Sequence, residues 1–99
     1  MKLRAADALM AAIPRRVPSR TALENCRIIA HRGEHDNVRT LENTLPAFER
    51  ARAAGVWGIE CDIRWTADGV PVICHDPTAE RVFGHPAVIG ELPFSRLRA

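Results

Sequence analysis

Residues 27–51 read RIIAHRGEHDNVRTLENTLPAFERA, and this stretch decides how the chain begins to fold. Its short apolar run predicts a buried strand over residues 27–31. The polar segment that follows, through residue 42, is typical of a loop. His31, Arg32 and Gly33 stand where the strand gives way to this loop. A titratable base, a permanent cation and a flexible glycine at a strand end indicate a site that handles an anion.

The same stretch then leads into a predicted helix. Asn43 or Thr44 supplies a side-chain oxygen that can cap its first turn. Pro46 falls within that turn, where a missing N–H costs little. Apolar residues recur at helical spacing after it, and Gly55 is placed to end the helix. A strand, a loop and a helix in this order predict half of a βαβ unit.

Residues 57–66 alternate between apolar and polar side chains, which predicts a strand with one apolar face. An Asp-Gly pair follows and favours a two-residue turn. We therefore predict a β-hairpin at residues 57–75, in which Asp62 lies opposite His75. Glu60 then shares their face, so that two carboxylates and an imidazole gather outside the apolar core. Because a shift of one residue reverses the faces, this grouping depends on the turn.

Glu60 and Asp62 are hard oxygen donors one residue apart on that strand. Such donors suit Mg²⁺ or Ca²⁺ better than zinc. Two carboxylates alone hold a hard cation weakly, so we expect a further ligand, for which phosphate oxygens are suited. The alternative is an exposed polar strand face on which both carboxylates are merely solvated.

A histidine ends each of the two apolar strands. The ordinary pKa of histidine suits proton transfer near neutral pH, so His31 and His75 are candidates for acid–base chemistry. One could deprotonate a nucleophile while the other protonates a leaving oxygen. Arg32 would offer a fork-shaped donor to a phosphate. The structural alternatives are histidines satisfied within the fold and a surface salt bridge for Arg32.

The composition is that of one small domain. The chain has 99 residues, 46% hydrophobic and 26% charged, with a net charge of +2. This charge is too small, and aromatic residues are too few, to indicate a nucleic-acid partner. Three cysteines without a CxxC pair favour neither a disulfide framework nor a zinc site. We expect them to be small buried hydrophobes in a reducing compartment.

Residues 1–26 are expected to form a basic N-terminal arm or short helix. Their apolar run is too short to span a bilayer, and its charged flanks fit a secretory signal poorly. We therefore expect a cytoplasmic protein. Because the apolar face is small, packing on the neighbouring fold or a loose arm is favoured over a membrane-surface helix. At the other end, the sequence predicts a loop from Asp76 through Pro86 and a helix from Glu91.

Four segments together carry a family resemblance: IAHRG, ENTLPAF, GIECDIRWTADGVPVICHD and TAERVFG. In this order and spacing, over about residues 27–97, they resemble the N-terminal part of the glycerophosphodiester phosphodiesterases. The resemblance implies an α/β fold, a TIM (β/α)8-type barrel of the phospholipase C-like phosphodiesterase kind. Residues 27–99 would supply only its first strands and helices, since such a barrel typically needs about 250 residues.

The resemblance also implies an activity. The reaction would be hydrolysis of glycerophosphodiesters, small-molecule substrates, to an alcohol and sn-glycerol 3-phosphate. By position, His31 and His75 are similar to the acid–base pair of the family. Arg32 is similar to its phosphate contact, and Glu42 to an active-site residue whose role stays open. The nucleophile, either water or a neighbouring substrate hydroxyl, also stays open.

The resemblance assigns the metal site as well. Glu60 and Asp62 are similar to the ligands of a divalent metal ion, Ca²⁺ or Mg²⁺. A later glutamate of the family would complete the metal shell and falls beyond Ala99. One alternative is therefore a truncated, inactive fragment or non-enzymatic remnant that self-associates through unfinished barrel edges. Another is a related phospholipase acting on lipid head groups, to which the basic arm would contribute.

Overall fold

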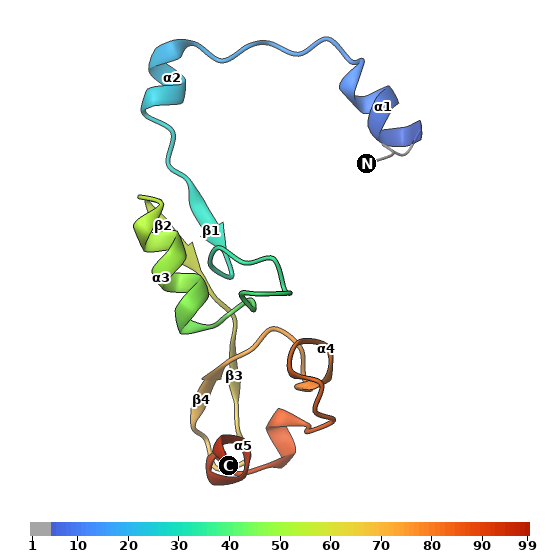
Figure 1. The fold of residues 1–99 in the computed structure, drawn as a ribbon, viewed down its shortest axis with the longest axis vertical. Helices are drawn as coiled ribbons and strands as arrows, with labels where there is room; N and C mark the ends of the chain where they lie inside the picture. Colours follow the sequence, from blue (N-terminus) through green and yellow to red (C-terminus); the bar gives the residue numbers. More distant parts are fainter. Residues whose placement is uncertain (1–4) are drawn as a thin grey trace.

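A computed structural model describes residues 5–99 and shows a small α/β unit in which these residues close no barrel (Figure 1). The elements are α1 (Ala5–Ala11), α2 (Arg20–Glu24), β1 (Ile29–His31), α3 (Leu45–Ala53), β2 (Gly58–Glu60), β3 (Ile63–Trp65), β4 (Pro71–Ile73), α4 (Glu80–Phe83), the 3₁₀ helix η1 (Ile89–Glu91) and α5 (Phe94–Arg98). The predicted helix over the first residues is partly confirmed by α1, and residues 1–4 lie outside the described range.

The stretch quoted above forms the first part of a complete βαβ unit. β1 and β2 pair in parallel, with Ile29 opposite Gly58 and His31 opposite Glu60. α3 connects the two strands and lies beside them in Figure 1. The prediction that the first strand is buried is wrong: Ile28 and Ile29 are 61% and 54% exposed. Their apolar side chains find no second layer within residues 5–99.

The ends of α3 confirm the predicted signals. The side-chain oxygen of Thr44 accepts the backbone N–H of Ala47, and Pro46 occupies the first turn. Ala54 closes the helix, and Gly55 follows with φ 76°, a left-handed conformation that glycine adopts without strain. Thr44 is therefore the capping residue, which leaves Asn43 for another role.

The predicted hairpin at residues 57–75 is wrong in its extent and register. Only β3 and β4 form the antiparallel pair, with Ile63 opposite Ile73 and Trp65 opposite Pro71. The backbone N–H of Thr66 donates to Val70 O, so the loop holds three residues instead of two. A turn whose third residue is a left-handed glycine closes such a loop, and the glycine there has φ 78°.

This shift of one residue removes the predicted pairing of Asp62 with His75. The backbone N–H of Cys74 donates to Asp62 O, so Cys74 takes the place expected for His75. Glu60 does not belong to the hairpin at all, because the predicted strand breaks after it. Glu60 therefore ends β2 of the parallel pair, whereas Asp62 lies in the short segment between β2 and β3.

The region after Asp76, predicted as loop, contains α4, which ends at Gly84 with φ 67°. Thr78 and Val88 pair across it in an isolated antiparallel bridge. The helix predicted from Glu91 is η1 followed by α5, because Pro93 separates the two. Of these elements, η1 contacts β3, and α5 lies at the turn end of the hairpin in Figure 1.

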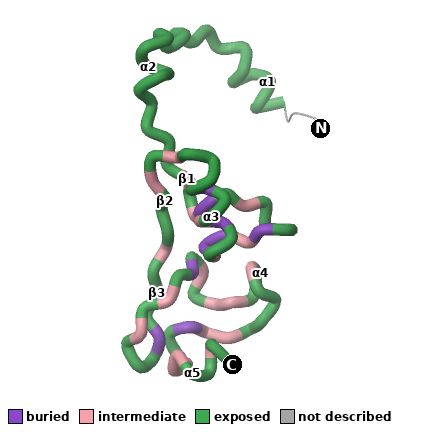
Figure 2. The backbone as a smooth tube through the Cα atoms, turned by 60° about the vertical axis from the view of Figure 1, so that its left-hand side comes forward, coloured by how far each residue is buried: buried purple, intermediate pink, exposed green. Residues whose placement is uncertain are grey.

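Burial is concentrated around α3 and the hairpin (Figure 2). Ala47, Ala51, Cys74 and Ile89 are the buried apolar residues of the described chain. The expectation that all cysteines are buried is wrong, since Cys26 and Cys61 are exposed. α1 and α2 lie on an arm that runs away from the strands. None of the helices described has the length and apolar character needed to cross a membrane.

Candidate active site

The parallel pairing of β1 and β2 brings one histidine beside one carboxylate. His31 and Glu60 end their strands side by side, with 3.8 Å between His31 Nε2 and Glu60 Oε2. The backbone N–H of Arg32 donates to Glu60 O at 2.9 Å and to Glu60 Oε2 at 3.3 Å. The carboxyl ends of parallel strands are where α/β folds gather functional groups. His31 and Glu60 therefore lie together at the carboxyl end of the parallel pair.

Arg32 joins two carboxylates that are distant in sequence. Its Nη1 donates to Glu42 Oε1 at 3.1 Å, and its Nε forms an ion pair with Asp62 Oδ2 at 3.1 Å. Arg32 has φ 57°, a strained conformation for a residue with a side chain. Its side chain is largely buried, so the alternative of an ordinary surface salt bridge does not describe it.

Glu42 is the most buried charged group of the described residues, at 2% exposure. Arg81 clamps its carboxylate, with Nη2 donating to Oε1 at 2.6 Å and Nη1 donating to Oε2 at 3.1 Å. Asn37 Nδ2 donates to Oε2 at 2.7 Å. The Arg81 hydrogen bonds outweigh desolvation and, together with Asn37 and Arg32, lower the pKa of Glu42 to about 2. Glu42 is therefore an ionised anchor at neutral pH.

Asp62 is held from a second side by Asn43. Asn43 Nδ2 donates to Asp62 Oδ2 at 3.0 Å, and the backbone N–H of Asp62 donates to Asn43 Oδ1 at 3.3 Å. The hydrogen bond from Asn43 is the main reason why the pKa of Asp62 is lowered. The charges of Arg32, His75 and His31 lower it further. Both histidines are thus within electrostatic reach of Asp62, although the pairing predicted for His75 is absent.

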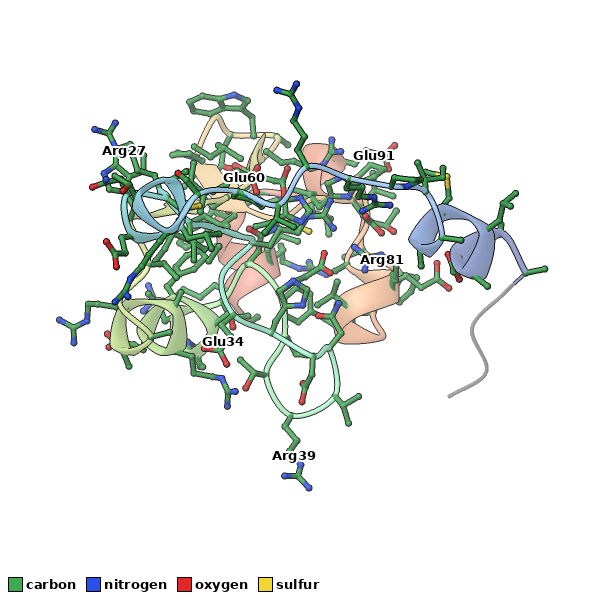
Figure 3. All side chains as sticks on the ribbon, turned by 90° about the horizontal axis from the view of Figure 1, so that it is seen from above. Arg27, Glu34, Arg39, Glu60, Arg81 and Glu91 are labelled. Carbon is green, nitrogen blue, oxygen red and sulfur yellow. The ribbon has the colours of Figure 1, made fainter. Side chains whose placement is uncertain are left out.

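His75 is bound by the residue that follows it. Its Nδ1 lies 2.7 Å from Asp76 Oδ1. Arg81 in turn donates from Nε to Asp76 Oδ2 at 2.8 Å and from Nη2 to Asp76 Oδ1 at 3.1 Å. The Arg81 hydrogen bonds, followed by that from His75, hold the pKa of Asp76 well below its usual range. Figure 3 shows the side-chain sticks of this region, with Glu60 and Arg81 labelled.

The structure joins most of the predicted site residues in one network and adds four more: Asn37, Asn43, Asp76 and Arg81. Sequence reasoning missed these roles. Asp76 had a signal, because it directly follows a candidate histidine. Arg81 lies in TAERVFG, one of the four segments that carry the resemblance, but its partner Glu42 is 39 positions away in sequence. No periodicity along the chain relates a residue of α4 to a loop so far away.

The residues present fit a hard divalent cation in chemistry but not in number. Glu60 and Asp62 offer carboxylate oxygens, and the Glu60 side chain is 44% exposed and accessible. Within residues 5–99 no group of three or more His, Cys, Asp or Glu is arranged to hold a metal ion. Ca²⁺ and Mg²⁺ bind about six or more oxygens. Further ligands would therefore have to come from water, substrate or elsewhere.

A family model described as the glycerophosphoryl diester phosphodiesterase family matches residues 31–99, more than half of the chain. "Glycerophosphodiester phosphodiesterase 1" of Rattus norvegicus is 42% identical over 89 residues, which cover 83% of this chain and 26% of that protein. A glycerophosphodiester phosphodiesterase of Caldanaerobacter subterraneus is 50% identical over 54 residues, 54% of this chain and 21% of that protein. The chain thus spans about a quarter of the length of these curated relatives.

The chain is also similar to solved structures of glycerophosphodiester phosphodiesterases. The crystal structure of a glycerophosphodiester phosphodiesterase from Thermotoga maritima has a TM-score of 0.65 and 39% identity. The match covers 75% of this chain and 32% of that one. A second such enzyme, from Agrobacterium tumefaciens, has a TM-score of 0.64 and 36% identity, covering 71% of this chain and 29% of that one.

Proposed function

Because the chain belongs to the glycerophosphoryl diester phosphodiesterase family, we propose that it carries part of the active site of a phosphoric diester hydrolase. The substrate would be a glycerophosphodiester, and the products an alcohol and sn-glycerol 3-phosphate. One observation carries the proposal: Arg32 connects the anchors Glu42 and Asp62 at the end of the strand that bears His31. A cation fixed in this way suits a phosphate group.

We further propose that residues 27–99 are the opening part of a (β/α)8 barrel of the phospholipase C-like phosphodiesterase kind, preceded by the arm over residues 1–26. The parallel β1–α3–β2 unit supports this, since it is the repeating unit of such barrels. The site residues cluster at the carboxyl end of β1 and β2, the face at which barrel enzymes place their chemistry.

Arg32 would be the phosphate contact in this scheme. Its guanidinium carries five N–H groups on three nitrogens. Two of these nitrogens are engaged, Nη1 by Glu42 and Nε by Asp62. The remaining donors are held in a fixed direction because both carboxylates restrain the fork. A fixed donor stabilises charge that develops on phosphate oxygens without reorganising during the reaction.

His31 and His75 would move the protons. One of them would take the proton of the attacking oxygen, and the other would protonate the oxygen of the leaving alcohol. The nucleophile is either water or the substrate hydroxyl next to the phosphate. Asp62, whose pKa both histidines lower, links the two histidines electrostatically.

Glu60 and Asp62 would hold the divalent cation, Ca²⁺ or Mg²⁺, together with ligands from outside these two side chains. When bound, the ion would stabilise negative charge on the phosphate. Asn43 and Arg32 fix the orientation of Asp62, as groups around metal ligands commonly do.

The test uses the intact protein with glycerophosphodiesters of different alcohols. His31→Ala and His75→Ala are each expected to lower kcat by about 100-fold or more, the usual worth of general acid–base catalysis. His85→Ala is the matched control, because the His85 ring lies in an exposed loop, where its Nδ1 accepts the backbone N–H of Ala87. Full activity in either of the first two variants would remove the assigned role.

A further inference from the structure

Arg81 connects two carboxylates of the site, Glu42 and Asp76. Neither Arg81 nor Asp76 is among the site residues that the resemblance assigns. It extends from α4 and grips the buried carboxylate of Glu42 with Nη1 and Nη2. With Nε and Nη2 it also holds both oxygens of Asp76. A guanidinium that uses its whole fork on two carboxylates cannot rotate without losing several charge-assisted hydrogen bonds. Arg81 is therefore a fixed point, and its anchor is Glu42.

Asp76 Oδ1, which accepts a hydrogen bond from Arg81, also faces the candidate catalytic residue His75. Asp76 Oδ1 lies 2.7 Å from His75 Nδ1. An ionised carboxylate only accepts hydrogen bonds, so Nδ1 must carry the proton of a neutral His75 ring. The lone pair of that ring then resides on Nε2, the nitrogen pointing away from Asp76. A carboxylate that sets the tautomer of a catalytic histidine in this way is the orienting member of a triad.

We propose that Asp76 and Arg81 form a positioning pair: Asp76 fixes the Nδ1–H tautomer of the His75 ring, and Arg81, anchored on Glu42, fixes Asp76. The inference rests on the proposed function in that His75 transfers a proton during hydrolysis. Neither residue touches the reacting atoms in this scheme. Without Arg81, the half-exposed His75 would lose its fixed neighbour, because an unrestrained Asp76 side chain can turn to solvent.

The sharpest variant is Asp76→Ala. Arg81 donates to both Asp76 oxygens, so either orientation of an asparagine amide would set its NH₂ group against an Arg81 donor. Alanine removes the acceptor at His75 Nδ1 and adds no donor, so the neutral ring should no longer be held in the Nδ1–H tautomer. Arg81→Met tests the second link in the same way, and Arg81→Lys keeps the charge but not the fork.

The readout is the side-chain ¹⁵N NMR spectrum of His75 in the intact protein, recorded where the ring is neutral and assigned with His75→Gln. We expect Nδ1–H in the unchanged protein and a mixture of tautomers in both Asp76→Ala and Arg81→Met. In parallel, kcat should fall by about 100-fold or more in Asp76→Ala, with KM nearly unchanged. Arg81→Lys should recover part of the kcat lost in Arg81→Met.

Arg39→Met is the matched control, because Arg39 projects from the tip of a loop, away from the rest of the chain (Figure 3). It should change neither the tautomer nor kcat. If His75 stays Nδ1–H in Asp76→Ala and in Arg81→Met, the positioning pair is refuted, even where His75→Ala abolishes hydrolysis and the proposed function stands. If the tautomer changes as expected but the unchanged protein hydrolyses no glycerophosphodiester, the positioning holds and the proposed function falls.

Discussion

Glu42 shows at the scale of one residue how the site is held together. A carboxylate at 2% exposure would be costly to bury alone, but Arg32, Arg81 and Asn37 all donate to it. Its neighbours come from two segments, the loop between β1 and α3 and the helix α4, so a single charge draws together parts of the chain that share no hydrogen-bonded strand. The site is organised around this anion as much as around its histidines.

Glu42 should therefore make stability depend on acid pH. Its pKa falls from an ordinary 4.5 in the unfolded chain to about 2 in the folded one, chiefly through Arg81. Because the folded pKa is the lower one, the ionised group stabilises the fold fully above about pH 4.5. This contribution is lost as the pH falls through about 2. Urea unfolding of the intact protein between pH 6 and the acid limit, on the order of pH 2, measures the loss.

Glu42→Gln should abolish most of this acid dependence and lower the free energy of unfolding at neutral pH by about 1–3 kcal/mol. Glu49→Gln is the control, because Glu49 is an exposed residue paired only with a neighbour on α3. Its stability should follow that of the unchanged protein at each pH. Parallel pH curves for the Glu42→Gln variant and the unchanged protein would contradict the assignment of the pKa shift to a buried ion pair.

At the scale of elements, the loop between β1 and α3 is fixed by close contact at Gly33. Gly33 has φ 84°, and a Cβ added to it would lie 2.8 Å from Ala47 atoms. The backbone N–H of Glu34 donates to Ala47 O at 3.0 Å, so the loop is tied to the first turn of α3. Arg32 and Asn43, both at positive φ, are joined next to this contact, because the backbone N–H of Asn43 donates to Arg32 O at 2.9 Å. These backbone hydrogen bonds hold the site residues against the helix.

Gly33→Ala should therefore be far more harmful than the same change at a glycine with open space. Gly69→Ala is the matched control, because Gly69 has φ 78° and nothing within 4 Å of a Cβ. We expect a cost of about 1 kcal/mol at Gly69 from backbone strain alone. At Gly33 the clash adds to it, for about 3 kcal/mol or more, with a fall in activity as Arg32 moves. Thermal unfolding of both variants decides this, and equal costs would contradict the close contact.

At the scale of the whole molecule, the described residues leave much apolar surface uncovered. The buried apolar side chains are few and mostly small, while Leu45, Trp57 and Ile59 line an open hollow of about 330 Å³ on α3 and β2. A soluble unit rarely leaves such a surface bare. The arm adds little cover, because it runs away from the strands (Figure 1). Arg27, directly after the arm, stacks on Trp57, with 5.0 Å between its guanidinium carbon and the ring centroid.

Residues 1–99 prepared alone should therefore unfold without a sharp transition and associate as their concentration rises. Circular dichroism on heating and light scattering over a concentration series measure both properties. Leu45→Ser should weaken the association, because Leu45 lines the hollow. Val17→Ser is the control, since it removes an equally exposed aliphatic side chain from the arm. A monomer with a sharp, concentration-independent transition would contradict this expectation.

The sequence by itself determined the features that depend on neighbours along the chain. The strand at Ile29, a helix cap at Asn43 or Thr44, and the end of α3 at Gly55 follow from local hydrogen bonds and backbone freedom. The ordered motifs that identify the family are local in the same sense. The hairpin register predicted from the sequence was wrong, because an Asp-Gly pair is compatible with both a two-residue and a three-residue loop. Which loop forms depends on contacts of the hairpin with the rest of the chain, such as the bond from Phe94 N to Asp68.

Only the tertiary structure decided which charges meet. It placed Glu60 beside His31 through a parallel pairing, and it brought Arg81 to Glu42 and Asp76. The contacts of His31 with Glu60 and of Arg81 with Glu42 join residues tens of positions apart, and no pattern of hydrophobicity specifies them. Electrostatic pairing acts through space, so the roles of Asn43, Asp76 and Arg81 appear only when the loops are in place.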